Sequence, residues 1–306
     1  MNDSTARRVL VLGGSGFIGR YAVAALLDGG VDVVVGTRRP GRPSGRLPTT
    51  ADGCEQRQVA FETLLDPADW SRLIGDVDAV LNCVGILRQK RSATYDRVHH
   101  RAPAALAEAC RASQRRFVHV SALSLPIDAG SRFLTSKRRG EKAIRSVGGD
   151  WMIARPSLLE GPDGFGARWL RGIARLPAFF APTAATGRIA ALDIRDLGDA
   201  LAILATAPTS TLNFTASREF DLGGDVALPF ADYIRALRRR HTAHRALAIP
   251  VPSFAARGFA HFCDLIDFTP FSFGHWELLQ RDNAPTRNRL AEVLGRTPRQ
   301  VIPLTA

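Results

Sequence analysis

The feature that most constrains the fold is a glycine-rich turn near the start of the chain. A short apolar strand at residues 8–12 runs directly into Gly13-Gly14-Ser15-Gly16-Phe17-Ile18-Gly19. Apolar residues at helical spacing follow, at positions 21, 22, 25 and 26. A strand, a glycine turn and a helix in this order open a β-α-β unit, which is the building block of a parallel sheet.

The alternation of strands and helices continues to residue 154. Further strands are predicted at 31–36, 57–61, 78–83, 116–120 and 151–154, and helices at 66–73, 94–111 and 132–147. Such alternation is typical of a parallel sheet covered by helices on both faces. We therefore expect an α/β fold in which residues 1–154 form a Rossmann-type, doubly wound parallel sheet that binds a dinucleotide.

The pattern of residues 155–306 predicts a small mixed C-terminal lobe that contacts a substrate or a protein partner. The pattern indicates a strand at 189–194 and a helix at 196–205, and we expect segment 189–222 to return to the Rossmann sheet. Three or four helical pieces follow Gly224. Ligands of such sheets bind beyond the carboxyl ends of the strands, so a lobe placed there would cover the binding site.

Composition excludes several classes of protein. The chain has 41 basic and 29 acidic residues, a formal charge of +12, and 45% hydrophobic residues, which is a globular and not a disordered composition. The arginines are scattered rather than gathered in one stripe, so we expect no specific nucleic-acid partner. No apolar run reaches the roughly 18 residues of a transmembrane segment.

Cysteine and histidine spacing gives no sign of a metal site. The four cysteines, Cys54, Cys83, Cys110 and Cys263, form no CxxC pair, which argues against a disulfide framework or a zinc site and favours a cytoplasmic protein. His241 and His244 share a basic segment, interpreted as a helix, but no third ligand is nearby. We expect no bound metal.

The spacing Gly13-x-x-Gly16-x-x-Gly19 indicates a bound dinucleotide. Glycines permit the tight turn and let the backbone approach the pyrophosphate, while the following helix N-terminus supplies free N–H donors. We therefore place Gly13, Gly16, Phe17, Ile18 and Gly19 at the cofactor. A purely structural glycine turn is the alternative.

Two arginines follow the second strand, where an acid usually binds the ribose 2′-hydroxyl of NAD. This chain has Thr37-Arg38-Arg39 there and no carboxylate. A guanidinium group matches a phosphate with two parallel hydrogen bonds, so Arg38 and Arg39 favour NADP(H) over NAD(H). Two solvated arginines are the alternative interpretation.

Three segments resemble the short-chain dehydrogenase/reductase superfamily. Asn82-Cys83-Val84-Gly85 resembles its NxAG segment, Ser121 resembles its catalytic serine, and Phe133-Leu134-Thr135-Ser136-Lys137 aligns with its YxxSK motif. The resemblance implies that Ser121 hydrogen-bonds a substrate carbonyl and that Lys137 binds the nicotinamide ribose. It also implies cofactor contacts at Cys83, Val84, Gly85 and Pro156.

The tyrosine of that motif is replaced by Phe133. In the superfamily, the phenol donates a proton to the carbonyl and the lysine lowers the phenol's pKa from about 10. Phenylalanine has no proton to donate. The other tyrosines, Tyr21, Tyr95 and Tyr233, lie in predicted helices, and their positions in the sequence do not indicate that one of them fills the gap.

Motifs beyond residue 154 extend the resemblance to about residues 7–285. They are Arg155-Pro156-Ser157, Gly161-Pro162, residues 193–200, Leu222-Gly223-Gly224, Glu277-Leu278-Leu279 and Asp282-Asn283. Together they resemble atypical extended members of the NAD-dependent epimerase/dehydratase superfamily, in particular bacterial relatives of the nucleotide-binding accessory subunit of respiratory complex I. That resemblance implies tight NADP(H) binding with little evident turnover.

Two functions therefore stay open. One is an oxidoreductase or epimerase acting on an unidentified carbonyl substrate, and the other is a non-catalytic NADP(H)-binding accessory or sensing protein that docks on a partner complex. Core packing is the favoured interpretation of a late phenylalanine cluster, with a hydrophobic substrate channel, a protein partner or a peripheral membrane contact as alternatives. The cluster comprises Phe254, Phe259, Phe262, Phe268, Phe271 and Phe273.

Overall fold

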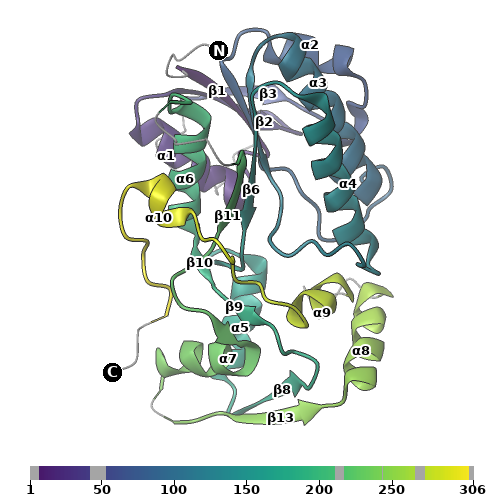
Figure 1. The fold of residues 1–306 in the computed structure, drawn as a ribbon, viewed down its shortest axis with the longest axis vertical. Helices are drawn as coiled ribbons and strands as arrows, with labels where there is room; N and C mark the ends of the chain where they lie inside the picture. Colours follow the sequence, from purple (N-terminus) through teal and green to yellow (C-terminus); the bar gives the residue numbers. More distant parts are fainter. Residues whose placement is uncertain (1–6, 42–52, 211–216, 243, 266–272, 303–306) are drawn as a thin grey trace.

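A parallel sheet of seven strands forms the centre of the molecule (Figure 1). The computed structural model describes residues 7–41, 53–210, 217–242, 244–265 and 273–302. The strand order is β11-β6-β5-β4-β1-β2-β3, and every pair is parallel. This order, which reverses direction at β1, confirms the expected doubly wound α/β fold. The strands are β1 (Arg8–Leu12), β2 (Asp32–Thr37), β3 (Glu55–Gln58), β4 (Ala79–Asn82), β5 (Arg116–Val120), β6 (Trp151–Pro156) and β11 (Glu219–Leu222).

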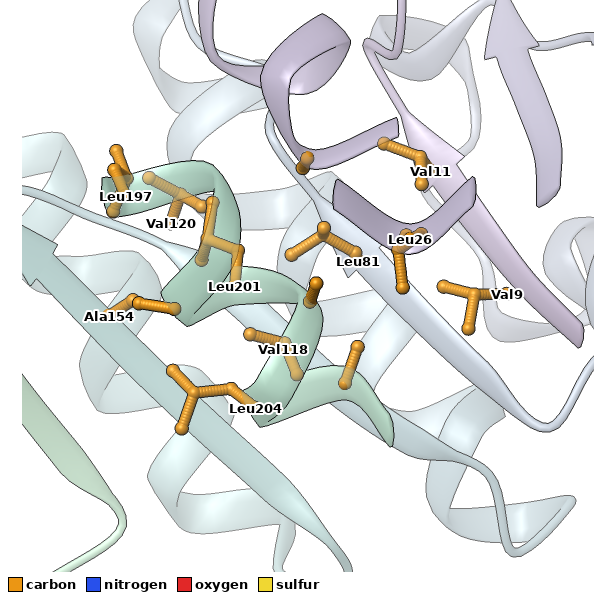
Figure 2. Close-up of a cluster of buried hydrophobic side chains, with 14 of the residues drawn as sticks. Val9, Val11, Leu26, Leu81, Val118, Val120, Ala154, Leu197, Leu201 and Leu204 are labelled. Carbon is orange, nitrogen blue, oxygen red and sulfur yellow. The ribbon is translucent and has the colours of Figure 1, made fainter. Parts of the chain in front are cut away.

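Helices cover both faces of this sheet. One face carries α1 (Phe17–Asp28) and α6 (Ile194–Thr206), and the other carries α2 (Pro67–Ile74), α3 (Ala102–Ala112) and α4 (Arg132–Val147). Successive residues of β1 point to opposite faces, so Val9 and Val11 enter the first core and Leu10 the second. Figure 2 shows the first core, where Leu26 of α1 and Leu201 of α6 pack over the strands.

Two elements of the first half differ from the predicted ones. The third strand is β3 and not 57–61, because Phe61 turns into the core in a short 3₁₀ segment and packs on Trp70 at 5.4 Å between ring centroids. The helix predicted at 94–111 contains a π-helical turn, Arg97–Arg101, before α3. Pro103 lies at the start of α3 and has no N–H to donate to the preceding turn, which is consistent with a wider turn there.

A small mixed lobe follows the sheet, and its core includes Tyr233, Ile234 and Phe179. Its strands form three two-stranded pairs, β7 with β10, β9 with β12, and β8 with β13. The remaining elements are β7 (Leu159–Glu160), α5 (Phe165–Arg175), β8 (Ala178–Pro182), β9 (Arg188–Ile189), β10 (Leu192–Asp193), β12 (Leu228–Pro229), α7 (Phe230–Arg239), β13 (Leu247–Val251), α8 (Ser253–Leu265), α9 (Phe273–Leu279) and α10 (Leu290–Leu294).

The single strand predicted at 189–194 is instead two short strands, β9 and β10, and neither belongs to the central sheet. The chain rejoins the Rossmann unit through α6, which packs on α1, and through β11, which pairs with β6. The division of the chain at residue 154 stays a prediction. The prediction that His241 and His244 lie on a helix is also wrong, because α7 ends at Arg239.

Helix α9 and the segment after it connect the lobe to the carboxyl end of the sheet. Glu277 accepts hydrogen bonds from the backbone N–H groups of Gly130 (2.7 Å) and Ser131 (2.8 Å), which precede α4. Asn283 accepts one from the N–H of Leu158 at 2.8 Å. The late motif residues therefore hold the lobe against the loops that follow β5 and β6. No helix among the described residues is long and apolar enough to cross a membrane.

Candidate functional site

The glycine turn after β1 leaves a set of backbone donors open. Gly13 has φ +70°, a conformation that favours glycine, and its N–H bonds to the carbonyl of Gly36 in β2 at 3.1 Å. A Cβ at Gly19 would lie 2.2 Å from the Gly13 oxygen, so α1 can approach the turn only with glycine there. In the described part of the chain, the N–H groups of Phe17, Ile18 and Gly19 donate to no protein group. Such an open helix N-terminus favours an anion.

The residues after β4 lie against this turn. A Cβ at Gly13 would be 3.2 Å from Cγ2 of Val84 and 3.4 Å from the backbone oxygen of Cys83. The side-chain oxygen of Asn82 accepts a hydrogen bond from the N–H of Val84 at 3.0 Å, which holds the bend. Burial raises the pKa of the Cys83 thiol, so this side chain stays neutral. Cys83 and Val84 are therefore brought to the glycine turn.

Arg38 and Arg39 lie at the same edge of the sheet. They directly follow β2, whose Gly36 bonds to Gly13. Both side chains are exposed, and neither guanidinium forms an ion pair or a hydrogen bond with the residues that the structure describes. The Arg39 N–H donates weakly to Oγ1 of Thr37 at 3.4 Å. Both positive charges are thus available to a ligand that reaches the end of β2.

Ser121 carries a buried hydroxyl with no hydrogen-bond partner among the residues that the structure describes. It directly follows β5, its N–H donates to the carbonyl of Ala154 at 2.8 Å, and the carbonyl of Pro156 accepts the N–H of Leu123 at 3.1 Å. The Ser121 residue is 5% exposed, and no group in the described ranges forms a hydrogen bond with its Oγ. Because an unpaired buried polar group destabilises a fold, this oxygen indicates a place for a ligand group.

Lys137 and Phe133 occupy the same face of α4. The Lys137 Nζ lies 5.8 Å from the centroid of the Phe133 ring, which is buried. Lys137 itself is half-buried, and no hydrogen bond or ion pair within the described residues holds its ammonium group. Burial lowers the pKa of Lys137 to about 8, although the nearby Glu141 carboxylate acts in the opposite direction. The ammonium is therefore available to a ligand next to an aromatic ring.

His99 connects the loop after β4 to α4, and no motif in the sequence indicates this role. Its Nε2 accepts the N–H of Ile86 at 3.2 Å, so its proton is on Nδ1, which lies 3.0 Å from Oγ of Ser136. The Ser136 hydroxyl donates onward to the carbonyl of Phe133 at 2.8 Å. Burial and the Lys137 charge lower the pKa of His99, so the ring is neutral. Ser136 is thus committed to a structural network.

Tyr95 lies next to the position of the missing phenol. Its ring stacks on His99 at 5.5 Å and meets the edge of Phe133 at 5.7 Å between centroids. The Tyr95 hydroxyl donates to the carbonyl of Leu87 at 2.7 Å. The sequence gives no sign of this contact, because Tyr95 and Phe133 belong to different elements that only the tertiary fold brings together. Tyr21 packs on Phe17, at the other side of the sheet.

A second buried histidine lies behind the site. Nδ2 of Asn82 donates to Nδ1 of His119 at 3.1 Å, because the oxygen of that amide already accepts the Val84 N–H. Burial, with the Lys137 charge as a second cause, lowers the pKa of His119 to about 3. Both histidines are neutral near pH 7. The positive charge at this place therefore comes from Lys137.

These observations fit a nicotinamide dinucleotide. The open N–H groups of α1 match a pyrophosphate, the exposed arginines match a phosphate on the ribose, and the ammonium of Lys137 matches ribose hydroxyls. The Oγ of Ser121, which is unpaired within the described residues, supplies a hydrogen-bond donor at the carboxyl end of β5. No group of three or more His, Cys, Asp or Glu residues in the described ranges is placed to hold a metal ion.

The relatives found by sequence comparison include a reductase and a subunit of a respiratory enzyme. A ceramide reductase of Caulobacter vibrioides is 28% identical over 201 residues, which cover 65% of this chain and 61% of that protein. The mitochondrial NADH dehydrogenase (ubiquinone) 1 alpha subcomplex subunit 9 of Dictyostelium discoideum is 27% identical over 251 residues, 81% of this chain and 68% of the relative. This chain thus spans about three fifths of the first relative and two thirds of the second.

Structural comparison and a family profile agree with this result. The NADPH complex of an Escherichia coli NADPH-dependent quinone oxidoreductase has the same fold, with a TM-score of 0.67, 15% identity, and coverage of 95% of this chain and 96% of the other. The profile of the NAD dependent epimerase/dehydratase family matches residues 9–214, which is more than half of the chain. The chain therefore belongs to the NAD dependent epimerase/dehydratase family, as an NAD(P)-binding member with a Rossmann-type sheet.

Proposed function

We propose that this protein is an NADP(H)-dependent oxidoreductase, or an epimerase that uses the same hydride chemistry, acting on a carbonyl substrate. The observation that carries the proposal is the buried Ser121 hydroxyl, which has no partner in the described part of the protein. A donor in that condition gains a hydrogen bond when a carbonyl oxygen reaches it. Lys137, on α4, supplies a second group that is open to a ligand.

The preference for NADP(H) rests on Arg38 and Arg39. Both are exposed at the end of β2 and have no carboxylate partner among the described residues. A 2′-phosphate would form charge-assisted hydrogen bonds with these guanidinium groups, whereas the 2′-hydroxyl of NAD(H) carries no charge to attract them. The end of β2 has no acid to bind that hydroxyl.

The roles of the protein groups follow from their chemistry. When bound, the nicotinamide would supply or accept the hydride. Ser121 would donate a hydrogen bond to the carbonyl oxygen and stabilise the negative charge that develops there. Lys137 would hold the ribose. Since Phe133 has no proton to give, the proton for the alkoxide would come from the Lys137 ammonium or from solvent.

The test is the absorbance of reduced nicotinamide when carbonyl compounds are added to the protein with NADPH. The compounds include a lipid carbonyl, since the Caulobacter relative is named as a ceramide reductase. We expect Ser121→Ala to lower kcat roughly 100-fold while NADPH affinity stays the same. Ser146→Ala, at an exposed position on α4, is the matched control and should retain activity. Full activity of Ser121→Ala would show that Ser121 does not stabilise the carbonyl oxygen.

A second candidate is a nucleotide-holding accessory subunit, and Phe133 favours it. The replacement of a phenol by a phenyl ring removes the usual proton donor while leaving Lys137 able to hold a ribose. The Dictyostelium relative is named as a subunit of NADH dehydrogenase. Tight NADPH binding without consumption of the reduced band for any compound tested would support this candidate.

A further inference from the structure

One face of the β8–β13 ribbon is apolar and exposed. The two strands are parallel, and Ile249 lies opposite Phe180. Phe179 points into the lobe core at 3% exposure, whereas its neighbour Phe180 is 71% exposed and Leu247 is 67% exposed. Side chains alternate between the faces of a strand, so Phe180, Leu247 and Ile249 lie on the open face. A solvated face of such a ribbon would normally be polar.

Helix α8 continues this apolar surface. Only Pro252 separates β13 from α8, and the N–H of Thr183, after β8, bonds to the carbonyl of Val251. The inner face of α8 is buried, whereas Phe254 is 80% exposed and Phe262 is 53% exposed. Core packing is thus the wrong interpretation for Phe254 and Phe262, and also for Phe259, which is 53% exposed. Phe268 and Phe271 lie outside the described residues. We call Phe180, Leu247, Ile249, Phe254 and Phe262 the apolar patch.

Four arginines border the start of the ribbon. Arg175 lies three residues before β8, and Arg245 lies two residues before β13; parallel strands begin at the same end. Arg239 is the last residue of α7, and Arg240 follows it. The side chain of Arg238 holds this helix end near the start of the ribbon by hydrogen bonds to the carbonyls of Leu176 (2.7 Å) and His244 (2.7 Å). We call Arg175, Arg239, Arg240 and Arg245 the basic rim.

The basic rim is exposed, and none of its four arginines forms an ion pair within the described residues. The surrounding segments are also strongly basic as a whole. Residues 165–182 and 228–265 contain nine arginines and two aspartates, with no lysine and no glutamate. In Figure 1, β8 and β13 lie at the end of the molecule away from the central sheet, with α8 beside them. The patch is therefore separate from the nucleotide site.

We propose that the apolar patch and the basic rim dock this protein on an anionic lipid membrane surface. Aromatic and aliphatic side chains bordered by arginines are the composition of interfacial membrane-binding surfaces, where the apolar groups enter the headgroup boundary and the guanidinium groups bind lipid phosphates. A second copy of the chain fits less well, because pairing through this face would bring two basic rims together. The proposal does not depend on whether the protein turns over a substrate.

Vesicle sedimentation tests the proposal on the full chain. We expect the wild type to sediment with vesicles of mixed phosphatidylglycerol and phosphatidylcholine but not with pure phosphatidylcholine, and added salt should release it. Phe180→Ser/Phe254→Ser should lower the partition coefficient for the anionic vesicles at least about tenfold. Arg239→Glu/Arg245→Glu should do the same.

Matched controls keep the test specific. Ile127→Ser removes an apolar side chain that is 86% exposed, outside the patch, and should bind vesicles like the wild type. Arg72→Glu/Arg101→Glu makes the same change of net charge at exposed positions on the Rossmann half and should retain most of the binding. NADPH binding by every variant serves as the check of folding.

Three results would overturn the proposal. The first is a wild type that stays in the supernatant with anionic vesicles. The second is an equal loss of binding in the control variants, which would show attraction by net charge alone. The third is a dimer in sedimentation velocity that Phe180→Ser/Phe254→Ser dissociates, without vesicle binding, which would assign the patch to a second copy.

Discussion

The ammonium of Lys137 lies 5.8 Å from the centroid of the Phe133 ring, at the place where members of a related superfamily have a phenol. The lysine is retained next to a ring that cannot donate a proton. Its partial burial is unfavourable for its charge, which lowers its pKa to about 8. A group kept at a cost to stability is typical of a binding site, which supports the proposal that Lys137 holds a ribose.

Restoring the phenol should restore proton transfer. Phe133→Tyr places a hydroxyl one helical turn before Lys137, and general acid catalysis typically contributes about 10²- to 10⁴-fold. We expect this variant to reduce small carbonyl compounds faster than the wild type, measured by the loss of NADPH absorbance. Phe133→Leu, which adds no donor, should bring no gain. A fast wild type that Phe133→Tyr leaves unchanged or impairs would show that another group donates the proton.

Replacing Lys137 should stabilise the protein in a pH-dependent way. The pKa of Lys137 is lower in the folded protein, about 8, than in the unfolded chain, about 10.5. The unfolded state therefore binds more protons between these values, and the stability of the wild type rises with pH across that range. After allowance for its partial exposure, Lys137→Met should be more stable by roughly 1 kcal/mol below pH 8.

Denaturant unfolding of both proteins at pH 7 and pH 10 checks this sign. The difference in the free energy of unfolding should shrink toward pH 10, and Lys137→Met should also bind NADPH more weakly. Lys142→Met, at an exposed position on the same helix, is the control and should show no such pH dependence. A Lys137→Met variant that is less stable than the wild type at pH 7 would contradict the assigned cause of the shift.

Gly16 and Gly19 of the turn should respond differently to substitution. A Cβ at Gly19 would lie 2.2 Å from the Gly13 oxygen, so Gly19→Ala should destabilise the fold by about 3 kcal/mol or more. At Gly16 the nearest atom to such a Cβ is that same oxygen at 3.0 Å, a much smaller conflict. Gly16→Val should therefore keep its circular dichroism spectrum but lose NADPH binding, because the side chain occupies the approach of the pyrophosphate. Unchanged NADPH binding by Gly16→Val would show that the glycine turn does not contact the pyrophosphate.

Local signals explain why much of the Rossmann half could be predicted. The bounds of β5 and α4 agree with the sequence because each element carries its own limits, such as Ser131, whose Oγ caps α4, and Gly148 after its last residue. Strands β1, β2 and β4 are buried on both faces, which makes them continuous apolar runs. The glycine turn and the end of β2 could be predicted because each directly follows such an apolar run.

The remaining features depend on contacts that a sequence pattern does not encode. The segment at 188–193 pairs with β7 and β12, which are distant in the chain, so its apolar run did not reveal two short strands. The contacts of His99 and Tyr95 with Phe133 require the packing of the π-helical turn on α4. The exposure of Phe180 and Phe254 could not be predicted either, since periodicity indicates burial for an apolar residue.

Calorimetric titration of the wild type and of Arg38→Asp with NADPH and with NADH measures the nucleotide preference itself. We expect the wild type to bind NADPH more tightly than NADH. Arg38→Asp should weaken NADPH binding by roughly 2 to 3 kcal/mol and change NADH binding little, because only the 2′-phosphate requires the guanidinium group. Equal affinity of the wild type for both nucleotides, or equal weakening of both by Arg38→Asp, would show that these arginines do not bind a 2′-phosphate.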